Sequence, residues 1–91
     1  MATNASFTKA QITKVAQMAH DGLARAIRPA HTPSDGDTVF GLATGRYEGP
    51  APVGRVGALA ADVLAEAILR AVRNAAGLPG IPSVSELSPA R

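Results

Sequence analysis

Two aspartates separated by one glycine, Asp35-Gly36-Asp37, are the residues whose types and spacing best suit chemistry in this sequence. They follow the turn-forming residues 32–34 and precede an apolar run, so both carboxylates stand at the mouth of an expected strand. Such a pair can orient a nucleophile, bind a cation or hold an amine. Aspartates in turns also commonly accept hydrogen bonds from their own backbone. On spacing alone, we interpret the pair as a structural turn.

The two histidines, His20 and His31, form no recognised metal-binding pattern in the sequence. A zinc site would call for a helical i,i+4 pair or a His-Glu-x-x-His order, and neither occurs. A calcium loop would continue the acidic positions to a closing glutamate. The sequence has no cysteine, no Gly-x-Ser-x-Gly elbow and no phosphate-cradling loop. We therefore expect no metal and no cofactor, and interpret both histidines as ordinary hydrogen-bonding side chains.

An amphipathic helix is expected over residues 8–28, directly before the acidic turn. Thr8 and Gln11 form a capping-box pattern, in which each side chain can bond the other's backbone N–H. Apolar residues then recur at steps of three and four, with polar residues on the opposite side. Asp21 and Arg25 are one helical turn apart in the order that favours an ion pair. A proline directly after residue 28 ends the pattern.

The remaining elements follow from similar signals. A short buried strand is expected at residues 38–43, where strand-forming side chains open an apolar run. Residues 45–54 are rich in glycine and proline and form a surface connection. The helical period returns over residues 54–77, with a glycine as its C-terminal stop. Residues 78–91 are interpreted as an irregular tail, and residues 2–7 as the last part of another strand.

The size of the chain limits what these elements can form by themselves. Its 91 residues allow one domain at most, and only 3% of them are aromatic, so the core consists of small side chains that bury little area. A two-stranded ribbon is marginal in water. The fold class is therefore α/β, with two helices and one or two strands that need neighbours from outside this chain.

The charge pattern and hydropathy exclude other classes of function. The net charge is +2, with basic residues spread along the chain and few aromatic rings, a composition that disfavours nucleic-acid binding. No stretch approaches the roughly 20 apolar residues of a membrane span. The start of the sequence also lacks the charged-then-apolar order of a signal peptide. We expect a cytoplasmic protein that binds neither nucleic acid nor membranes.

Three runs of the sequence closely resemble the small-subunit region of peptidase family S58: AHDGLARAIRPAHT at residues 19–32, DGDTVF at residues 35–40 and LATG at residues 42–45. That family contains the L-aminopeptidase/D-esterases, the β-peptidyl aminopeptidases and the nylon-oligomer (6-aminohexanoate-oligomer) hydrolases. The first two runs are most similar to the nylon-oligomer branch. The alanine-rich second helix and the Gly-Ile-Pro at residues 80–82 extend the resemblance over nearly the whole chain.

The resemblance implies the small subunit of an N-terminal-nucleophile amidohydrolase. In this family a precursor cleaves itself before a threonine or serine, whose hydroxyl becomes the nucleophile while its own amine takes the proton. The large and small subunits of the precursor stay together in an αββα sandwich, which assembles into higher homo-oligomers. The implied substrates are short peptides, amino-acid amides and ω-amino-acid oligomers.

The resemblance also changes the interpretation of the acidic turn. Asp35 and Asp37 match the acidic pair that would hydrogen-bond and orient the nucleophile, and so become the expected catalytic residues. Laid onto the family pattern, Met1 falls about five residues after that nucleophile, which we therefore expect outside this chain. The chain alone is expected to be inactive. The alternative function is a non-catalytic fragment or helical interaction module whose apolar stripes bind a partner.

Overall fold

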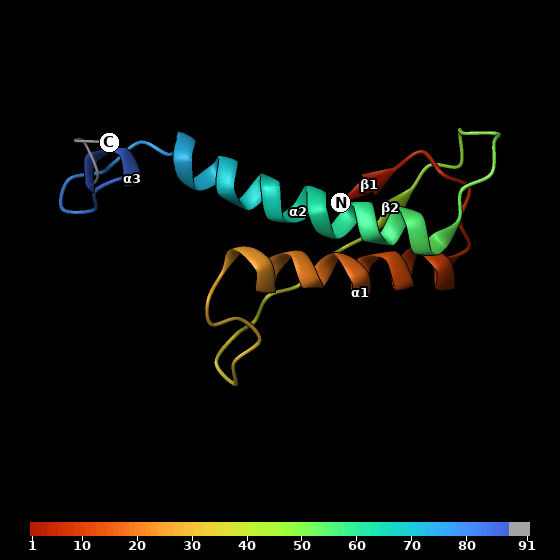
Figure 1. The fold of residues 1–91 in the computed structure, drawn as a ribbon, viewed down its shortest axis with the longest axis horizontal. Helices are drawn as coiled ribbons and strands as arrows, with labels where there is room; N and C mark the ends of the chain where they lie inside the picture. The colour runs from red at the N-terminus through yellow and green to blue at the C-terminus, as the bar shows by residue number, and fades with distance from the viewer. Residues whose placement is uncertain (88–91) are drawn as a thin grey trace.

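The computed structural model describes residues 1–87 and has a mixed α/β architecture. Along the chain, the elements are β1 (Ala2–Thr3), α1 (Lys9–Ala26), β2 (Leu42–Ala43), α2 (Val53–Asn74) and α3 (Val84–Leu87). Helices α1 and α2 lie side by side and run in the same direction, and the C-terminal part of α2 extends beyond the end of α1 (Figure 1). The prediction of two long helices and an α/β fold is confirmed.

Helix α1 begins at the predicted capping box. The Gln11 N–H donates to Thr8 Oγ1 at 3.2 Å, and the Thr8 N–H donates to Gln11 Oε1 at 2.9 Å. The last helical hydrogen bond runs from the Ile27 N–H to the Leu23 carbonyl at 2.8 Å. The helix thus ends slightly before residue 28, because the residue preceding Pro29 is disfavoured in the helical conformation.

The two short strands are parallel and joined through α1, so β1, α1 and β2 form a β–α–β unit. Ala2 is level with Leu42 and Thr3 with Ala43. The Leu42 N–H donates to the Met1 carbonyl at 3.1 Å, and the Thr44 N–H donates to the Thr3 carbonyl at 3.0 Å. The expected strand within residues 2–7 is present, although it is only two residues long.

The prediction of a buried strand over residues 38–43 is wrong in length and in burial. Only Leu42 and Ala43 pair as a strand. The alternate side chains Phe40 and Leu42 are 80% and 61% exposed, whereas Gly41 packs against Ile12 of α1. One face of the two-stranded ribbon therefore rests on the helices, and its other face is open. The sequence predicts a buried strand because apolar residues occur on both faces of it. The described residues cover only one of these two faces.

The core lies between α1 and α2 and is built from small side chains. Val15 and Ala19 of α1 are fully buried, and Ala60 of α2 packs against them. A Cβ placed on Gly22 would lie 2.5 Å from the Ala61 carbonyl oxygen, so only glycine allows the two helices to approach this closely. The contact explains why α1 carries a glycine in its interior despite the cost to helix stability.

Arg25 pairs across this helix contact and not within α1. Its guanidinium forms an ion pair with Asp62 of α2, instead of the predicted partner Asp21 one turn away. The side chains of Arg25 and Asp62 are 53% and 68% exposed, so the pair adds little stability. Within α2, where the acid precedes the base by one turn, Glu66 Oε1 and Arg70 Nε form an ion pair at 3.3 Å.

Helix α2 ends before its expected glycine stop. Its last residue is Asn74, whose side chain donates to the Arg70 carbonyl at 2.8 Å, and the next residue is extended. The described part of the tail contains a turn closed between Leu78 and Ile81, followed by α3. Residues 88–91 of the predicted tail lie outside the described residues. Among residues 1–87, none of the helices combines the length and apolar character needed to cross a membrane.

The Gly22 contact generates a stability prediction. Gly22→Ala forces α1 away from the Ala61 carbonyl and is expected to lower the free energy of unfolding by about 1–3 kcal/mol. Gly54→Ala is the matched control, because a Cβ at that position of α2 meets nothing within 4 Å. The control is expected to be neutral or stabilising by up to about 1 kcal/mol. Urea unfolding followed by far-UV circular dichroism measures the free energy of unfolding of both variants. Equal values for Gly22→Ala and Gly54→Ala would refute the close contact at Gly22.

Candidate functional site

The acidic turn lies in the loop that leaves the C-terminal end of α1 and returns to β2 (Figure 1). The Thr32 N–H donates to Asp35 Oδ2 at 3.0 Å, and the Asp35 N–H donates to the Thr32 carbonyl at 3.0 Å. Asp35 therefore closes its own turn, as the spacing alone suggested. Asp37 is exposed, and within residues 1–87 its carboxylate makes no hydrogen bond. The two aspartates thus differ, and Asp37 is the one whose carboxylate is available to another group.

The histidines meet where this loop leaves α1. His20 Nδ1 and His31 Nε2 are 3.0 Å apart, and the ring centroids are 5.1 Å apart. This contact joins His31 of the loop, four residues before Asp35, to helix α1. His31 reaches this position with a φ of 58°, in the left-handed region. The sequence predicted two ordinary hydrogen-bonding histidines but not that they contact each other. A left-handed backbone at a non-glycine residue leaves no clear signal in the sequence.

These side chains form no larger cluster. Among the residues that the structure describes, no group of three or more His, Cys, Asp or Glu side chains could hold a metal ion. The histidine pair and the Asp35 turn therefore act as two local restraints on one loop. Both lie in the loop that carries Asp37, on the N-terminal side of that residue.

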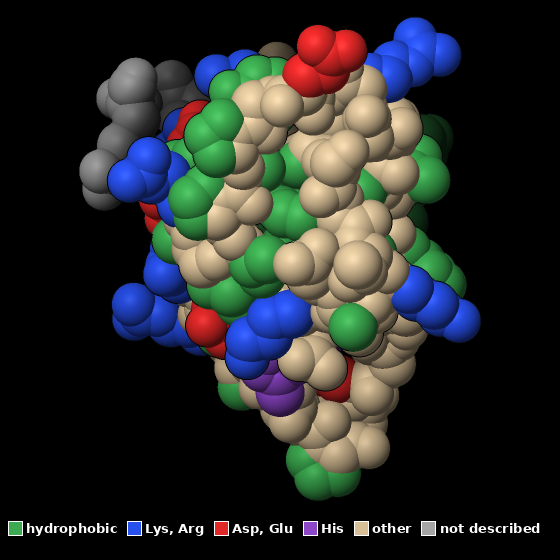
Figure 2. Space-filling view, turned by 90° about the vertical axis from the view of Figure 1, so that its right-hand side faces the viewer, with side chains coloured by type: hydrophobic (Ala, Val, Ile, Leu, Met, Phe, Trp, Pro, Cys, Tyr) green, Lys and Arg blue, Asp and Glu red, His purple; other side chains and the backbone are tan. Residues whose placement is uncertain are grey.

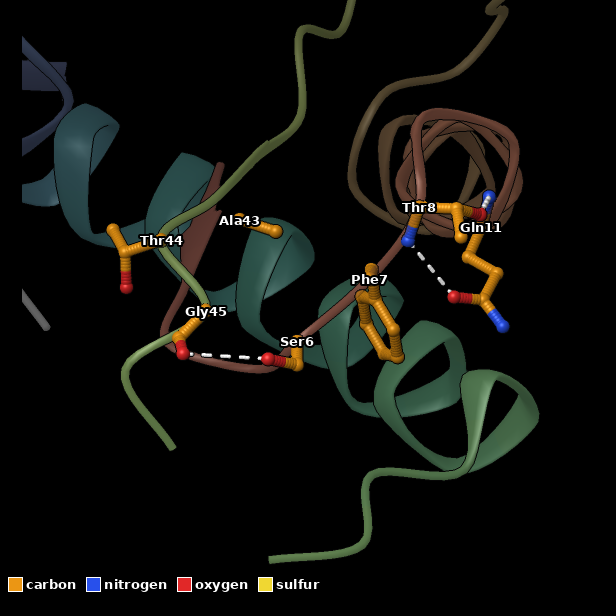
Figure 3. A pocket seen from close by; sticks show the side chains of 7 residues that line it. All are labelled: Ser6, Phe7, Thr8, Gln11, Ala43, Thr44 and Gly45. Carbon is orange, nitrogen blue, oxygen red and sulfur yellow. Dashed lines mark hydrogen bonds between the residues drawn. The ribbon is translucent and has the colours of Figure 1, made fainter. Parts of the chain in front are cut away.

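A polar cleft of about 400 Å³ lies where β1 leads into α1 and beside the end of β2 (Figure 3). Its described lining contains hydroxyl and amide side chains but no histidine and no carboxylate: Ser6, Phe7, Thr8, Gln11, Ala43, Thr44 and Gly45. The Ser6 hydroxyl donates to the Gly45 carbonyl at 3.3 Å, and Thr8 and Gln11 bond each other in the helix cap. Without a base in the cleft, these hydroxyls are weak nucleophiles. The acidic turn is therefore the candidate functional site.

Charge is spread over the surface. Figure 2 shows Lys and Arg side chains at separate places on the visible face, with hydrophobic and other uncharged surface between them. On this face they do not gather into one basic patch. Large hydrophobic side chains are exposed as well, among them Leu42 of β2 and Leu59 and Val63 of α2.

Comparison with known proteins gives a family and several longer relatives. The sequence model described as "Peptidase family S58" matches residues 1–84. A Mycobacterium bovis protein named as an uncharacterized aminopeptidase is 46% identical over 102 residues, covering 98% of this chain and 30% of the relative. A Mycobacterium leprae protein, also named as an uncharacterized aminopeptidase, is 47% identical over 102 residues, covering 98% and 28%.

The name of a more distant relative states its substrate. A 6-aminohexanoate-oligomer endohydrolase from Kocuria sp. is 29% identical over 82 residues, covering 78% of this chain and 23% of the relative. No solved structure matches the chain significantly. The chain spans less than a third of the length of these curated relatives, so most of each relative lies outside the matched segment.

The different bonding of the two aspartates predicts different effects of removing them. Asp35→Ala removes the acceptor of the Thr32 N–H and is expected to speed amide hydrogen exchange at Thr32 about fivefold, in line with a net hydrogen bond of about 1 kcal/mol. Asp37→Ala is the matched control and should leave exchange at Thr32 unchanged. Exchange measured by NMR checks both variants, and a similar response to the two would show that Asp35 does not close the turn.

Proposed function

The chain belongs to peptidase family S58, and on that premise we propose that it is the small-subunit region of an N-terminal-nucleophile amidohydrolase. The relatives named as aminopeptidases and as 6-aminohexanoate-oligomer endohydrolases support a peptidase-type amide hydrolysis. The proposed substrates are short peptides, amino-acid amides and ω-amino-acid oligomers. The acidic turn supplies the side chains that orient the nucleophile, and a large subunit from the same precursor supplies the rest of an αββα sandwich.

The observation that carries this proposal is the register of β1 on β2. Each residue of β1 is level with the residue 40 positions later, since Ala2 pairs with Leu42 and Thr3 with Ala43. By the family pattern, the nucleophile precedes Met1 by about five residues. A strand that continues back in the same parallel register brings that position level with Gly36. The nucleophile would then lie beside the acidic turn, between the two aspartates.

This placement suits the chemistry of an N-terminal nucleophile. A hydroxyl attacks an amide carbonyl efficiently only when a general base takes its proton, and in an N-terminal nucleophile that base is the residue's own neutral amine. A carboxylate beside the α-amino group can accept a hydrogen bond from it, which orients the amine toward the hydroxyl and stabilises the ammonium that forms as the proton is transferred. Asp37 has a carboxylate available for this role, while Asp35 closes the turn that presents it.

The activity can be tested by transplantation into a longer relative. A chimera replaces the matched segment of the Mycobacterium bovis aminopeptidase with this chain, and hydrolysis of amino-acid p-nitroanilides and of 6-aminohexanoate oligomers is measured. The chimera is expected to turn over at least one substrate class, whereas the isolated 91-residue chain should turn over none. In the chimera, Asp37→Asn should lower kcat by about 100-fold or more, because the nucleophile loses its orienting group.

The matched control is Glu48→Gln, which neutralises an exposed loop carboxylate outside the acidic turn and should leave kcat unchanged. Turnover by the isolated chain would contradict the need for a nucleophile outside it. Equal kcat values for the parent chimera and its Asp37→Asn variant would contradict the role of the turn. An inactive chimera beside an active parent relative would favour the alternative, a non-catalytic interaction module.

A further inference from the structure

In the part of the chain that the structure describes, one contact between histidines ties the loop after α1 back to that helix. His20 Nδ1 and His31 Nε2 are 3.0 Å apart. Within residues 1–87, every other hydrogen bond of residues 28–39 stays inside the loop. The chain next packs against the core of the helices at Val39. Between the end of α1 and Val39, this histidine pair is therefore the hydrogen-bonded connection of the loop to the helix.

The histidine pair is continuous in the chain with the acidic turn. His31 directly precedes Thr32, whose N–H donates to Asp35 Oδ2 at 3.0 Å. Asp37 follows two residues later and is exposed. Because the Asp35 turn starts at the residue after His31, a movement of His31 away from α1 would carry the turn and Asp37 with it.

The contact between two imidazoles depends on the number of protons that they share. One facing nitrogen must carry a hydrogen and the other a free lone pair. The bond survives one added proton, because an imidazolium donates to a neutral imidazole. A second added proton puts hydrogens on both facing nitrogens and a positive charge on both rings, so repulsion replaces the bond. The tethered loop thus binds one proton fewer than the released loop, and its attachment weakens as the pH falls.

The surroundings of the histidine pair offer no bonded counter-charge for a second proton. Charged side chains of the last turns of α1, of the loop and of the facing part of α2 are Asp21, Arg25, Arg28, Asp35, Asp37 and Asp62. Arg25 and Asp62 pair with each other, and within residues 1–87 neither histidine forms an ion pair with a carboxylate. His31 is exposed, and histidine reaches the visible surface in Figure 2, so protons have access to the pair from water.

We propose that the histidine pair is a pH-sensitive tether, which holds the acidic turn in the position where it orients the nucleophile and releases it when a second proton binds. The effect on hydrolysis rests on the proposed function. His20 and His31 are positioning residues in this scheme, because they act on the nucleophile through Asp37. Histidine suits the task, since its charge changes between about pH 5 and 8.

Hydrogen–deuterium exchange of the chimera, followed by mass spectrometry, tests the tether without requiring activity. After correction for the intrinsic pH dependence of exchange, peptides covering residues 30–38 should exchange about fivefold faster at about pH 5 than at about pH 8, as expected for the loss of one hydrogen bond. His31→Asn should show the faster exchange at both pH values. Asparagine tolerates the left-handed backbone of His31, but its amide does not extend as far as Nε2.

His20→Asn is the matched variant that removes the change of charge and keeps a hydrogen-bonding group. Its neutral amide stands near the position of Nδ1 and both donates and accepts, so it can bond His31 in either protonation state. Its loop should keep the slow exchange at both pH values. Ser34→Ala alters an exposed loop side chain and should retain the pH response of the parent. Exchange in peptides from residues 9–19 reveals any variant in which α1 has unfolded.

The pH dependence of hydrolysis tests the link between the tether and the site. The kcat of the parent chimera, divided by that of its His20→Asn variant, should fall about fivefold from about pH 8 to about pH 5. KM should change little, because release of the turn removes orientation of the nucleophile and not substrate binding. The ratio cancels the titration of the nucleophile's own amine, which both proteins share. A ratio that is constant with pH would overturn control of hydrolysis by the histidine pair.

The exchange results separate this inference from the proposed function. The tether is overturned if the corrected exchange of the parent loop is the same at both pH values, or if the His31→Asn loop exchanges as slowly as the parent loop at about pH 8. A chimera that shows the expected exchange pattern but hydrolyses no amide supports the tether and counts against the hydrolase function alone.

Discussion

The close contact between α1 and α2 is the constraint on which the rest of this structure depends. Gly22 lets the backbones of the two helices approach closely at Ala61. The core side chains Val15, Ala19 and Ala60 are small enough to pack between helices at this short separation. Small side chains pack tightly but each removes little apolar area from water. The helix pair is therefore well defined in geometry, yet it leaves one side of α2 exposed and one face of the strand pair uncovered.

The helix pair also positions the candidate site, because α1 is the crossover between the two strands. One end of α1 receives the chain from β1, and its other end releases the loop that carries the acidic turn before the chain returns to β2. The His20–His31 contact and the Asp35 turn restrain that loop at two points. The position of Asp37 is thus linked through α1 to the register of the strands, which is the link that the proposed function uses.

The open surfaces have a common physical origin. Under the proposed function, the apolar faces that this chain exposes would lie inside a larger domain. The exposed Phe40 and Leu42 on the sheet and the exposed Leu59 and Val63 on α2 are examples. Burial of these side chains by further polypeptide would add hydrophobic stabilisation that the described residues cannot supply by themselves.

The sequence by itself determined the local features: the capping box at Thr8, both long helices, and the presence of two carboxylates on one turn. These depend on interactions between residues that are close in the chain. Only the tertiary structure decided that Arg25 pairs with Asp62 rather than Asp21, that His20 meets His31, and which side of the α2 stripe stays open. Each of these depends on how α1, α2 and the strands approach one another. That approach is governed by backbone contacts such as the one at Gly22, for which hydrophobic periodicity carries no signal.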